Sequence, residues 1–415
     1  MSGQLDDTPI GLARPQLRAL QHDLLGARDQ QILQVVAMVD ALPARGEADQ
    51  FITALRPRLA ILHPVRPLSF TRLLFLPLDP LIVAPSAWRR DALAVPRSVL
   101  LPLARLVRAA MTDQAAEIDR ALVGLSTEHD RQIAETGPAL WGEGGTLLAS
   151  ATVPPNWVDA TGLQPADFRT IVDIAAPILL HAARLQHVTQ LGTEGEATRR
   201  RDLDLLLQSI VTDGPGAFAA LTALLAERLP RADQVFFIAD DIAARQGDPA
   251  LRNAVDRAID ATIDGLELTA GQLQRLDQAS TALRHLVAVL EDLDAQCNQR
   301  PSRKARIAQL RLGIDTASRK QFSTAMETHI LHPAAMIAEA DDHQIASMEA
   351  SARDLRRFEV IARRLGGAEH YDRQLKGAAT ELRPKQGELV QTMIDRIRLI
   401  EILLGPEAAI AAFPG

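Results

Sequence analysis

The chain has 415 residues, of which 47% are hydrophobic and 23% charged, the balance of a folded globular protein with room for two or three domains. Its formal net charge of −7 argues against a general nucleic-acid binder, so no nucleic-acid partner is expected. Aromatic side chains make up only 3%, which disfavours a β-rich fold and surfaces that stack on bases or sugars.

The charges are unevenly distributed along the chain. Residues 1–110 carry 13 basic and 9 acidic side chains, whereas residues 111–299 carry 14 basic and 28 acidic ones. Residues 300–400 are again mildly basic. This pattern favours plain solubility or complementarity between domains, and the alternative is a basic end that meets an acidic partner or anionic lipid.

Three features of the sequence bear on the compartment. The single cysteine, Cys297, has no partner for an intramolecular disulfide, which indicates a reducing environment. The polar start of the chain lacks the pattern of a secretory signal, and no apolar run is long enough to span a bilayer. We therefore expect a cytoplasmic protein without a transmembrane segment.

The first part of the chain predicts helices interrupted by proline. Apolar residues at three-four spacing predict a helix over 15–42, and a second is expected over 47–63. Residues 57–102 hold eight of the 24 prolines yet are strongly apolar, which predicts short helical turns packed in the core. Pro96 is expected to begin a helix over 96–124, and Ser126 to cap one over 127–149.

The rest of the chain predicts longer helices. Gly142, Gly144 and Gly145, followed by Pro154 and Pro155, predict a loop and a domain boundary near residue 152. Further helices are expected at about 165–191, 195–212, 215–229, 231–246 and 249–265. A leucine repeat every seven residues predicts a helix over 269–297, followed by others at about 302–331, 334–365, 368–382 and 385–404, with a fraying tail from Pro406.

These elements predict an all-α protein. Its N-terminal half is expected to consist of short, proline-interrupted helices packed in pairs, in a solenoid-like arrangement. Its C-terminal third is expected to be a longer antiparallel bundle. The expected domains are residues 1–152, an acidic middle region 153–266, and residues 267–415.

Two groups of histidines resemble metal ligands in spacing only. His329 and His332 lie three apart, and His343 follows Glu339 at a spacing of four. A second ligand pair is lacking and Pro333 is expected to split the helix, so a solvated helix end is the simpler interpretation. His181 and His187 lie six apart, on different helix faces, and are expected to be isolated and partly buried. No metal or other cofactor is expected.

Catalytic motifs are missing from the sequence. It contains no phosphate-binding loop, no Gly-x-Ser-x-Gly elbow and no HExxH. The Asp240-Asp241 pair lacks a further aspartate three residues on, where Ala244 stands. Arginine clusters at 199–201, 300–311 and 353–364 suit phosphate or lipid contacts, but nearby acids favour plain solvated helix faces.

The most unusual segment runs from Arg72 to Arg97. Asp79 lies between Pro77 and Pro80 in an apolar run, and a buried carboxylate there needs a partner, for which Arg72 and Arg97 are the candidates. The alternative is a docking surface anchored by tryptophan and arginine, the residues favoured at interaction hot spots. The candidate binding residues are Arg72, Asp79, Trp88, Arg89, Arg90 and Arg97.

The sequence favours a helical scaffold or adaptor that binds another protein and has no catalytic activity. Two alternatives remain at this point. One is a peripheral membrane protein that uses arginine-rich helix faces and the apolar residues 68–83. The other is a helical enzyme or metal-binding protein.

Overall fold

The computed structural model describes residues 23, 27–42, 48–190, 196–273, 279–297 and 300–413. Within these ranges helices dominate, and the strands are two residues long: β1 (Ile82–Val83) and β2 (Val95–Pro96). The all-α prediction is confirmed. The chain divides into two compact units, residues 1–265 and 266–415, and each is described by itself. The predicted three-domain division stays a prediction.

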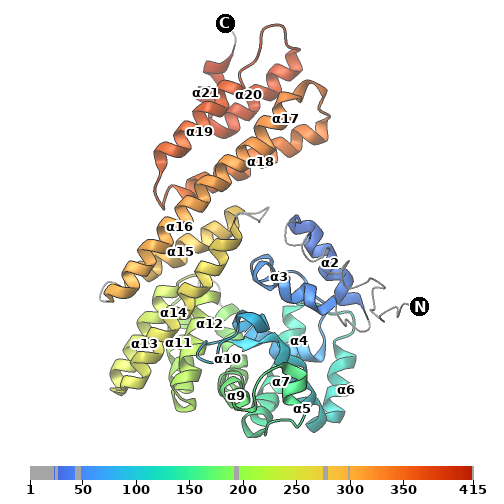
Figure 1. The fold of residues 1–415 in the computed structure, drawn as a ribbon, viewed down its shortest axis with the longest axis vertical. Helices are drawn as coiled ribbons and strands as arrows, with labels where there is room; N and C mark the ends of the chain where they lie inside the picture. The colour runs from blue at the N-terminus through green and yellow to red at the C-terminus, as the bar shows by residue number, and fades with distance from the viewer. Residues whose placement is uncertain are drawn as a thin grey trace, which may run out of the picture. The chain divides into compact units, whose positions relative to one another are not determined.

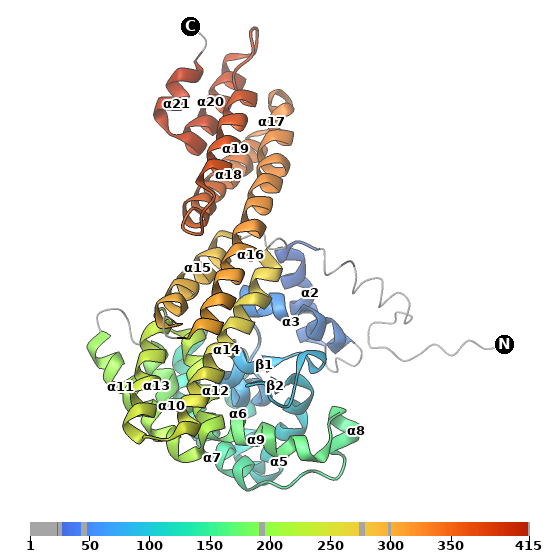
Figure 2. The same ribbon diagram turned by 60° about the vertical axis from the view of Figure 1, so that its left-hand side comes forward.

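The first unit contains helices of very different length (Figures 1 and 2). In chain order they are α2 (Asp29–Ala41), α3 (Asp49–Leu62), α4 (Phe70–Phe75), η2 (Leu76–Leu81), η3 (Pro85–Ala87), η4 (Arg97–Val99), α5 (Leu100–Ala110), α6 (Thr112–Ala121), α7 (Asp130–Ser150), α8 (Trp157–Thr161), α9 (Pro165–Leu180), α10 (Ala182–Gln190), α11 (Glu196–Ile210), η6 (Val211–Asp213), α12 (Pro215–Arg228), α13 (Ala232–Gln246) and α14 (Pro249–Gln272). Helices α11 to α13 stand side by side, and the unit ends within α14, at Gly265.

Pro57 lies inside α3, and the proline-rich segment that follows this helix, residues 64–102, folds into the short turns expected of it. Helix α4 and the 3-10 helix η2 have six residues each, and Leu73, Leu74 and Leu78 are fully buried. The predicted helix over 96–124 is wrong in two respects. Pro96 lies in β2, where it pairs with Val83 in a parallel ladder, so α5 begins later. The helix is also broken at Met111, between α5 and α6.

The glycines predicted to form a loop near residue 142 lie inside helix α7 instead. A Cβ added at Gly144 would come within 2.7 Å of Leu74 Cδ1. One added at Gly145 would come within 3.0 Å of the Ala176 carbonyl oxygen and of the Leu180 amide nitrogen. These two glycines therefore allow α7 to approach α4 and α9 closely, a packing role that is easily mistaken for a turn signal in a sequence.

Two glycine substitutions in α7 should have opposite effects on stability. Gly145→Ala should destabilise the protein by about 1–3 kcal/mol, because its methyl group meets backbone atoms of α9 that cannot move independently. Gly142→Ala should stabilise it by about 0.5–1 kcal/mol, because a Cβ there meets no atom within 4 Å and alanine favours helix. Urea unfolding of both variants measures the difference, and equal effects would contradict the close approach.

The second unit contains a set of longer helices (Figures 1 and 2). They are α15 (Ala279–Gln296), α16 (Pro301–Met326), the π-turn η9 (Glu327–Leu331), α17 (His332–Ala335), η10 (Ile337–Glu339), α18 (Asp342–Ala362), α19 (Ala368–Glu381), α20 (Val390–Leu404) and α21 (Pro406–Ala412). The tail from Pro406, predicted to fray, forms α21 and packs on α20.

The break in the second unit lies after Pro333 rather than at it. The backbone stays helical from α16 through the π-turn into α17, and the helix predicted over 334–365 begins only at Asp342. Asp341 sets that start, because its carboxylate accepts a hydrogen bond from the Gln344 amide while the Gln344 side chain bonds the Asp341 amide. A capping box of this kind fixes where a helix begins.

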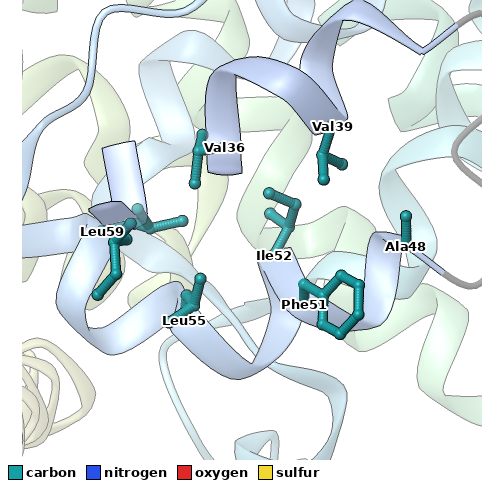
Figure 3. Close-up of a cluster of buried hydrophobic side chains, with 8 residues drawn as sticks. Val36, Val39, Ala48, Phe51, Ile52, Leu55 and Leu59 are labelled. Carbon is teal, nitrogen blue, oxygen red and sulfur yellow. The ribbon is translucent and has the colours of Figure 1, made fainter. Parts of the chain in front are cut away.

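Helices α2 and α3 form a hairpin with a core of its own (Figure 3), referred to below as the hairpin, residues 29–62. Its buried apolar side chains are Ile32, Val36, Val39, Ala48, Phe51, Ile52, Leu55 and Leu59. The partly buried apolar residues packed against them also lie between residues 27 and 62. Arg58 pairs with Asp29 inside the same hairpin, at 2.6 Å, with both side chains buried. The hairpin thus supplies its own apolar contacts.

Candidate functional site

Asp40 of the hairpin is held by two arginines of the proline-rich segment. Arg66 donates to both carboxylate oxygens, at 2.6 and 2.7 Å, and Arg72 contacts the same group at 3.3 Å. Only 1% of the Asp40 side chain is exposed. A carboxylate so removed from water requires charge-assisted hydrogen bonds of this kind, so the predicted binding residue Arg72 serves here to hold α2.

Two further arginine–aspartate pairs fix α3 to the same segment. Arg97 donates to both oxygens of Asp49, at 2.5 and 2.6 Å. Arg56 donates to Asp79 at 2.8 Å and also to the Ile82 carbonyl oxygen at 3.1 Å. The expected partner of Asp79 was wrong: it is Arg56, neither Arg72 nor Arg97, because α3 brings Arg56 next to η2 and β1.

The remaining predicted residues lie on the loop between β1 and β2, residues 84–94. Trp88 is half-buried, and its indole Nε1 donates to the Ala94 carbonyl oxygen at 3.1 Å, which closes the loop on itself. Arg90 donates to Asp167 at the start of α9, at 2.7 Å, and Arg257 of α14 donates to the Asp91 carbonyl oxygen at 3.2 Å. These contacts fix the loop in one conformation.

Arg89 is the least engaged of the predicted residues. Its guanidinium lies 3.5 Å from Asp91 and 3.9 Å from Asp264, and 69% of its side chain is exposed. Ion pairs this long and this exposed contribute little to stability. The structure therefore divides the six predicted residues. Arg72, Asp79 and Arg97 fix the hairpin, Trp88 and Arg90 fix the loop, and Arg89 faces solvent.

A cluster of charged groups surrounds Asp79, whose side chain is 52% exposed and not buried as the sequence predicts. Arg228, near the end of α12, donates to the Leu76 carbonyl oxygen at 3.0 Å and lies next to Glu227. Loss of hydration opposes the ionised form of Asp79, but Arg56, followed by Arg228 and His63, lowers its pKa below the usual range. The four groups come from three separate parts of the chain, so no local sequence pattern announces them.

Glu227 carries the most perturbed carboxyl group of this charged cluster. The residue is exposed by surface area, but protein crowds its carboxylate on several sides. The resulting loss of hydration, the largest cause, raises the pKa of Glu227 to about 7; Asp79 adds to this effect, and Arg228 and Arg56 oppose it.

This pKa predicts a pH-dependent effect of Glu227→Gln. The folded protein holds the Glu227 proton up to about pH 7, whereas the unfolded chain releases it near a pKa of 4.5, so wild-type stability falls as the pH rises through this window. Glutamine is uncharged throughout. The variant should therefore match wild type at about pH 4 and exceed it by about 1 kcal/mol at about pH 8, a figure reduced for the exposure of the group.

Urea unfolding at the two pH values measures this difference. Glu143→Gln, at an exposed position of α7, is the matched control for loss of one negative charge. A Glu227→Gln effect that is the same at both pH values would contradict the raised pKa.

The two histidines expected to be isolated both lie beside aspartates. His181 Nε2 lies 3.2 Å from Asp213, and His187 Nε2 lies 3.4 Å from Asp202. The expectation was wrong because α11 runs beside α10 and brings its own aspartate to His187, while the turn after α11 brings Asp213. Between α10, α11 and α13 lies a groove of about 690 Å³, lined in part by His187, Asp202 and Leu205.

Ser209 completes a serine–histidine–aspartate constellation at this groove. Its Oγ lies 3.3 Å from His181 Nδ1, but it also lies 2.7 Å from the Leu206 carbonyl oxygen and donates its proton there. A nucleophilic serine must instead donate to the histidine that acts as its base. The Ser209 proton is therefore not directed at His181, and the contacts of His181 with Ser209 and Asp213 tie the end of α9 to the end of α11.

The other histidine and arginine groups show no ligand-like assembly. His332 lies 3.6 Å from Glu327, and nowhere in the described ranges do three His, Cys, Asp or Glu side chains gather as metal ligands would. Arginines of the C-terminal strips lie beside acids, as in Arg356 with Glu359 at 2.6 Å. Among the described helices, none combines the length and apolar character needed to cross a membrane.

Comparison with known proteins gives no family for the chain. No family model, no curated protein and no solved structure matches it.

Proposed function

We propose that this protein is a helical scaffold or adaptor that binds another protein through the loop at residues 84–94. The observation that carries the proposal is Arg89, a cation with long ionic contacts on a loop that is otherwise held firmly. A preorganised loop loses little conformational entropy on binding, and arginine is among the residues enriched at binding hot spots. The partner surface that fits Arg89 carries a carboxylate.

The test is co-purification of the tagged full-length protein from its source cells, from soluble and membrane fractions separately. Wild type is compared with Arg89→Ala and with a matched control, Arg131→Ala, which removes an exposed arginine paired with the neighbouring Glu135 on α7. We expect a stoichiometric protein that is lost with Arg89→Ala and retained with Arg131→Ala. The same proteins at the same yield with all three chains would contradict the proposal.

Trp88, which the sequence predicts to anchor a docking surface, has a structural role in the loop. Because its indole closes the loop onto Ala94, Trp88→Ala would change the loop conformation together with any binding surface. Arg89→Ala removes a side chain that the fold scarcely uses. It therefore separates loss of binding from loss of structure.

A further inference from the structure

The hairpin is attached to the rest of the first unit mainly through charged contacts. Its apolar cluster includes no residue beyond Leu62 among those described, whereas the pairs Asp40–Arg66, Asp49–Arg97 and Arg56–Asp79 all cross to the proline-rich segment. An element whose apolar cluster is formed within itself exposes less of that cluster on leaving a neighbour than an element that shares a core with it. The contacts that it must exchange are ion pairs, and salt screens the pairs with a more exposed aspartate, Asp49–Arg97 and Arg56–Asp79, more than the buried Asp40.

The connection that follows the hairpin is short and conformationally unfavourable. Helix α3 ends at Leu62, and the next residue, His63, has a φ of 43° and a ψ of 56°, in the left-handed region. A non-glycine residue rarely adopts this conformation, and a residue before proline, here Pro64, favours an extended backbone. Both preferences would be satisfied if the connection straightened.

The chain after this connection is anchored independently of the hairpin. The Leu68 amide donates to the Leu125 carbonyl oxygen at 2.9 Å, and the Thr127 amide donates to the Arg66 carbonyl oxygen at 3.0 Å. A hollow of about 550 Å³ lies beside this stretch, lined by residues that include Val65 and Val123. Residues 63–65 therefore form a hinge between two separately held parts.

We propose that the hairpin is exchangeable: it swings out at residues 63–65 and docks on the same arginines of a second copy of this chain. A second copy of the chain offers the matching surface, since its Arg66, Arg72 and Arg97 are the same arginines that bind the carboxylates of this hairpin. Exchange between identical chains replaces each ion pair with the same ion pair, and it relieves the His63 conformation. Exchange of an identical element is a low-cost route to a dimer, and a short strained hinge favours it.

The proposal is independent of the partner proposed for Arg89 and is tested by mixing two charge-reversed chains. Asp49→Arg places two arginines at one clamp, and Arg97→Asp places two aspartates there, so each chain alone disfavours closure on itself. After exchange between the two chains, one clamp is the native pair and the other is its reversed equivalent. The pair Asp49–Arg97 is chosen because 42% of the Asp49 side chain is exposed, which leaves room for a larger side chain.

The two chains are mixed at high salt, returned to low salt, and measured by light scattering after size-exclusion chromatography. We expect a mixed species of twice the 45.1 kDa chain mass, enriched several-fold over either chain alone. The double variant Asp49→Arg/Arg97→Asp restores a pair within one chain, so it should fold and, like wild type, form less dimer than the mixture. His63→Gly, introduced into both single variants, should lower the dimer fraction because glycine accepts the left-handed conformation.

Three results would overturn the proposal. The first is a mixture that is no more dimeric than its separate components. The second is an equal amount of dimer from the double variant alone, because its clamp is intact within the chain. The third is a dimer fraction that His63→Gly leaves unchanged, because the hinge would then play no part.

Discussion

Asp40→Ala should destabilise the first unit by about 3 kcal/mol or more, because it removes the shared partner of two largely buried arginines. The carboxylate is 1% exposed, and the side chains of Arg66 and Arg72 are 12% and 18% exposed. Alanine leaves these guanidinium groups without their counter-ion and without full access to water. Urea unfolding followed by circular dichroism measures the loss.

The matched control is Asp119→Ala, which breaks a pair of the same chemistry at the surface. Asp119 lies 2.8 Å from Arg108, with both side chains more than two-fifths exposed. Its loss should cost under about 1 kcal/mol, because water replaces the lost contact. If Asp40→Ala cost no more than Asp119→Ala, the buried clamp would have no energetic importance.

Trp141→Ala should destabilise the protein by about 3–5 kcal/mol, the range for loss of a large buried aromatic side chain. Trp141 is 2% exposed on α7, and its indole lies over Gly137, where an added Cβ would meet the ring at 2.4 Å. Its Nε1 donates to the Leu73 carbonyl oxygen in α4 at 2.7 Å. The side chain thus joins the proline-rich segment to α7 by packing and by a hydrogen bond.

Trp141→Phe separates these two contributions. It keeps much of the apolar volume and removes the indole donor, and the Leu73 carbonyl oxygen retains its bond from the Leu76 amide. The cost should therefore be smaller, about 1–2 kcal/mol. A phenylalanine variant as unstable as the alanine variant would show that the hydrogen bond, rather than packing, carries the effect.

The sequence predicts the helices of this fold well where periodicity is regular. The helix predicted over 231–246 corresponds to α13, and the expected short turns of the proline-rich segment are present. Gly145 was wrongly predicted to lie in a loop, because the sequence does not distinguish a glycine that allows close helix packing from one that makes a turn. Pro96 misleads because its fixed φ suits a short strand as well as the start of a helix.

The candidate site was found only in part. The unusual composition of Arg72 to Arg97 identified a segment rich in specific contacts, but the partners of its charges lie on the hairpin, on α9 and on α14. No local sequence pattern specifies that Asp79 meets Arg56 or that Glu227 belongs to the same charged cluster. Contacts between distant segments depend on the tertiary fold, which periodicity does not determine.

Arginines of the proline-rich segment hold the hairpin in place through ion pairs with its aspartates. A double-mutant cycle on Asp49 and Arg97, with both alanine variants and their combination, measures this directly in urea unfolding. The two side chains form two hydrogen bonds at 2.5 and 2.6 Å, so we expect a coupling free energy of about 1 kcal/mol. A coupling below about 0.3 kcal/mol, the level of independent sites, would contradict the account.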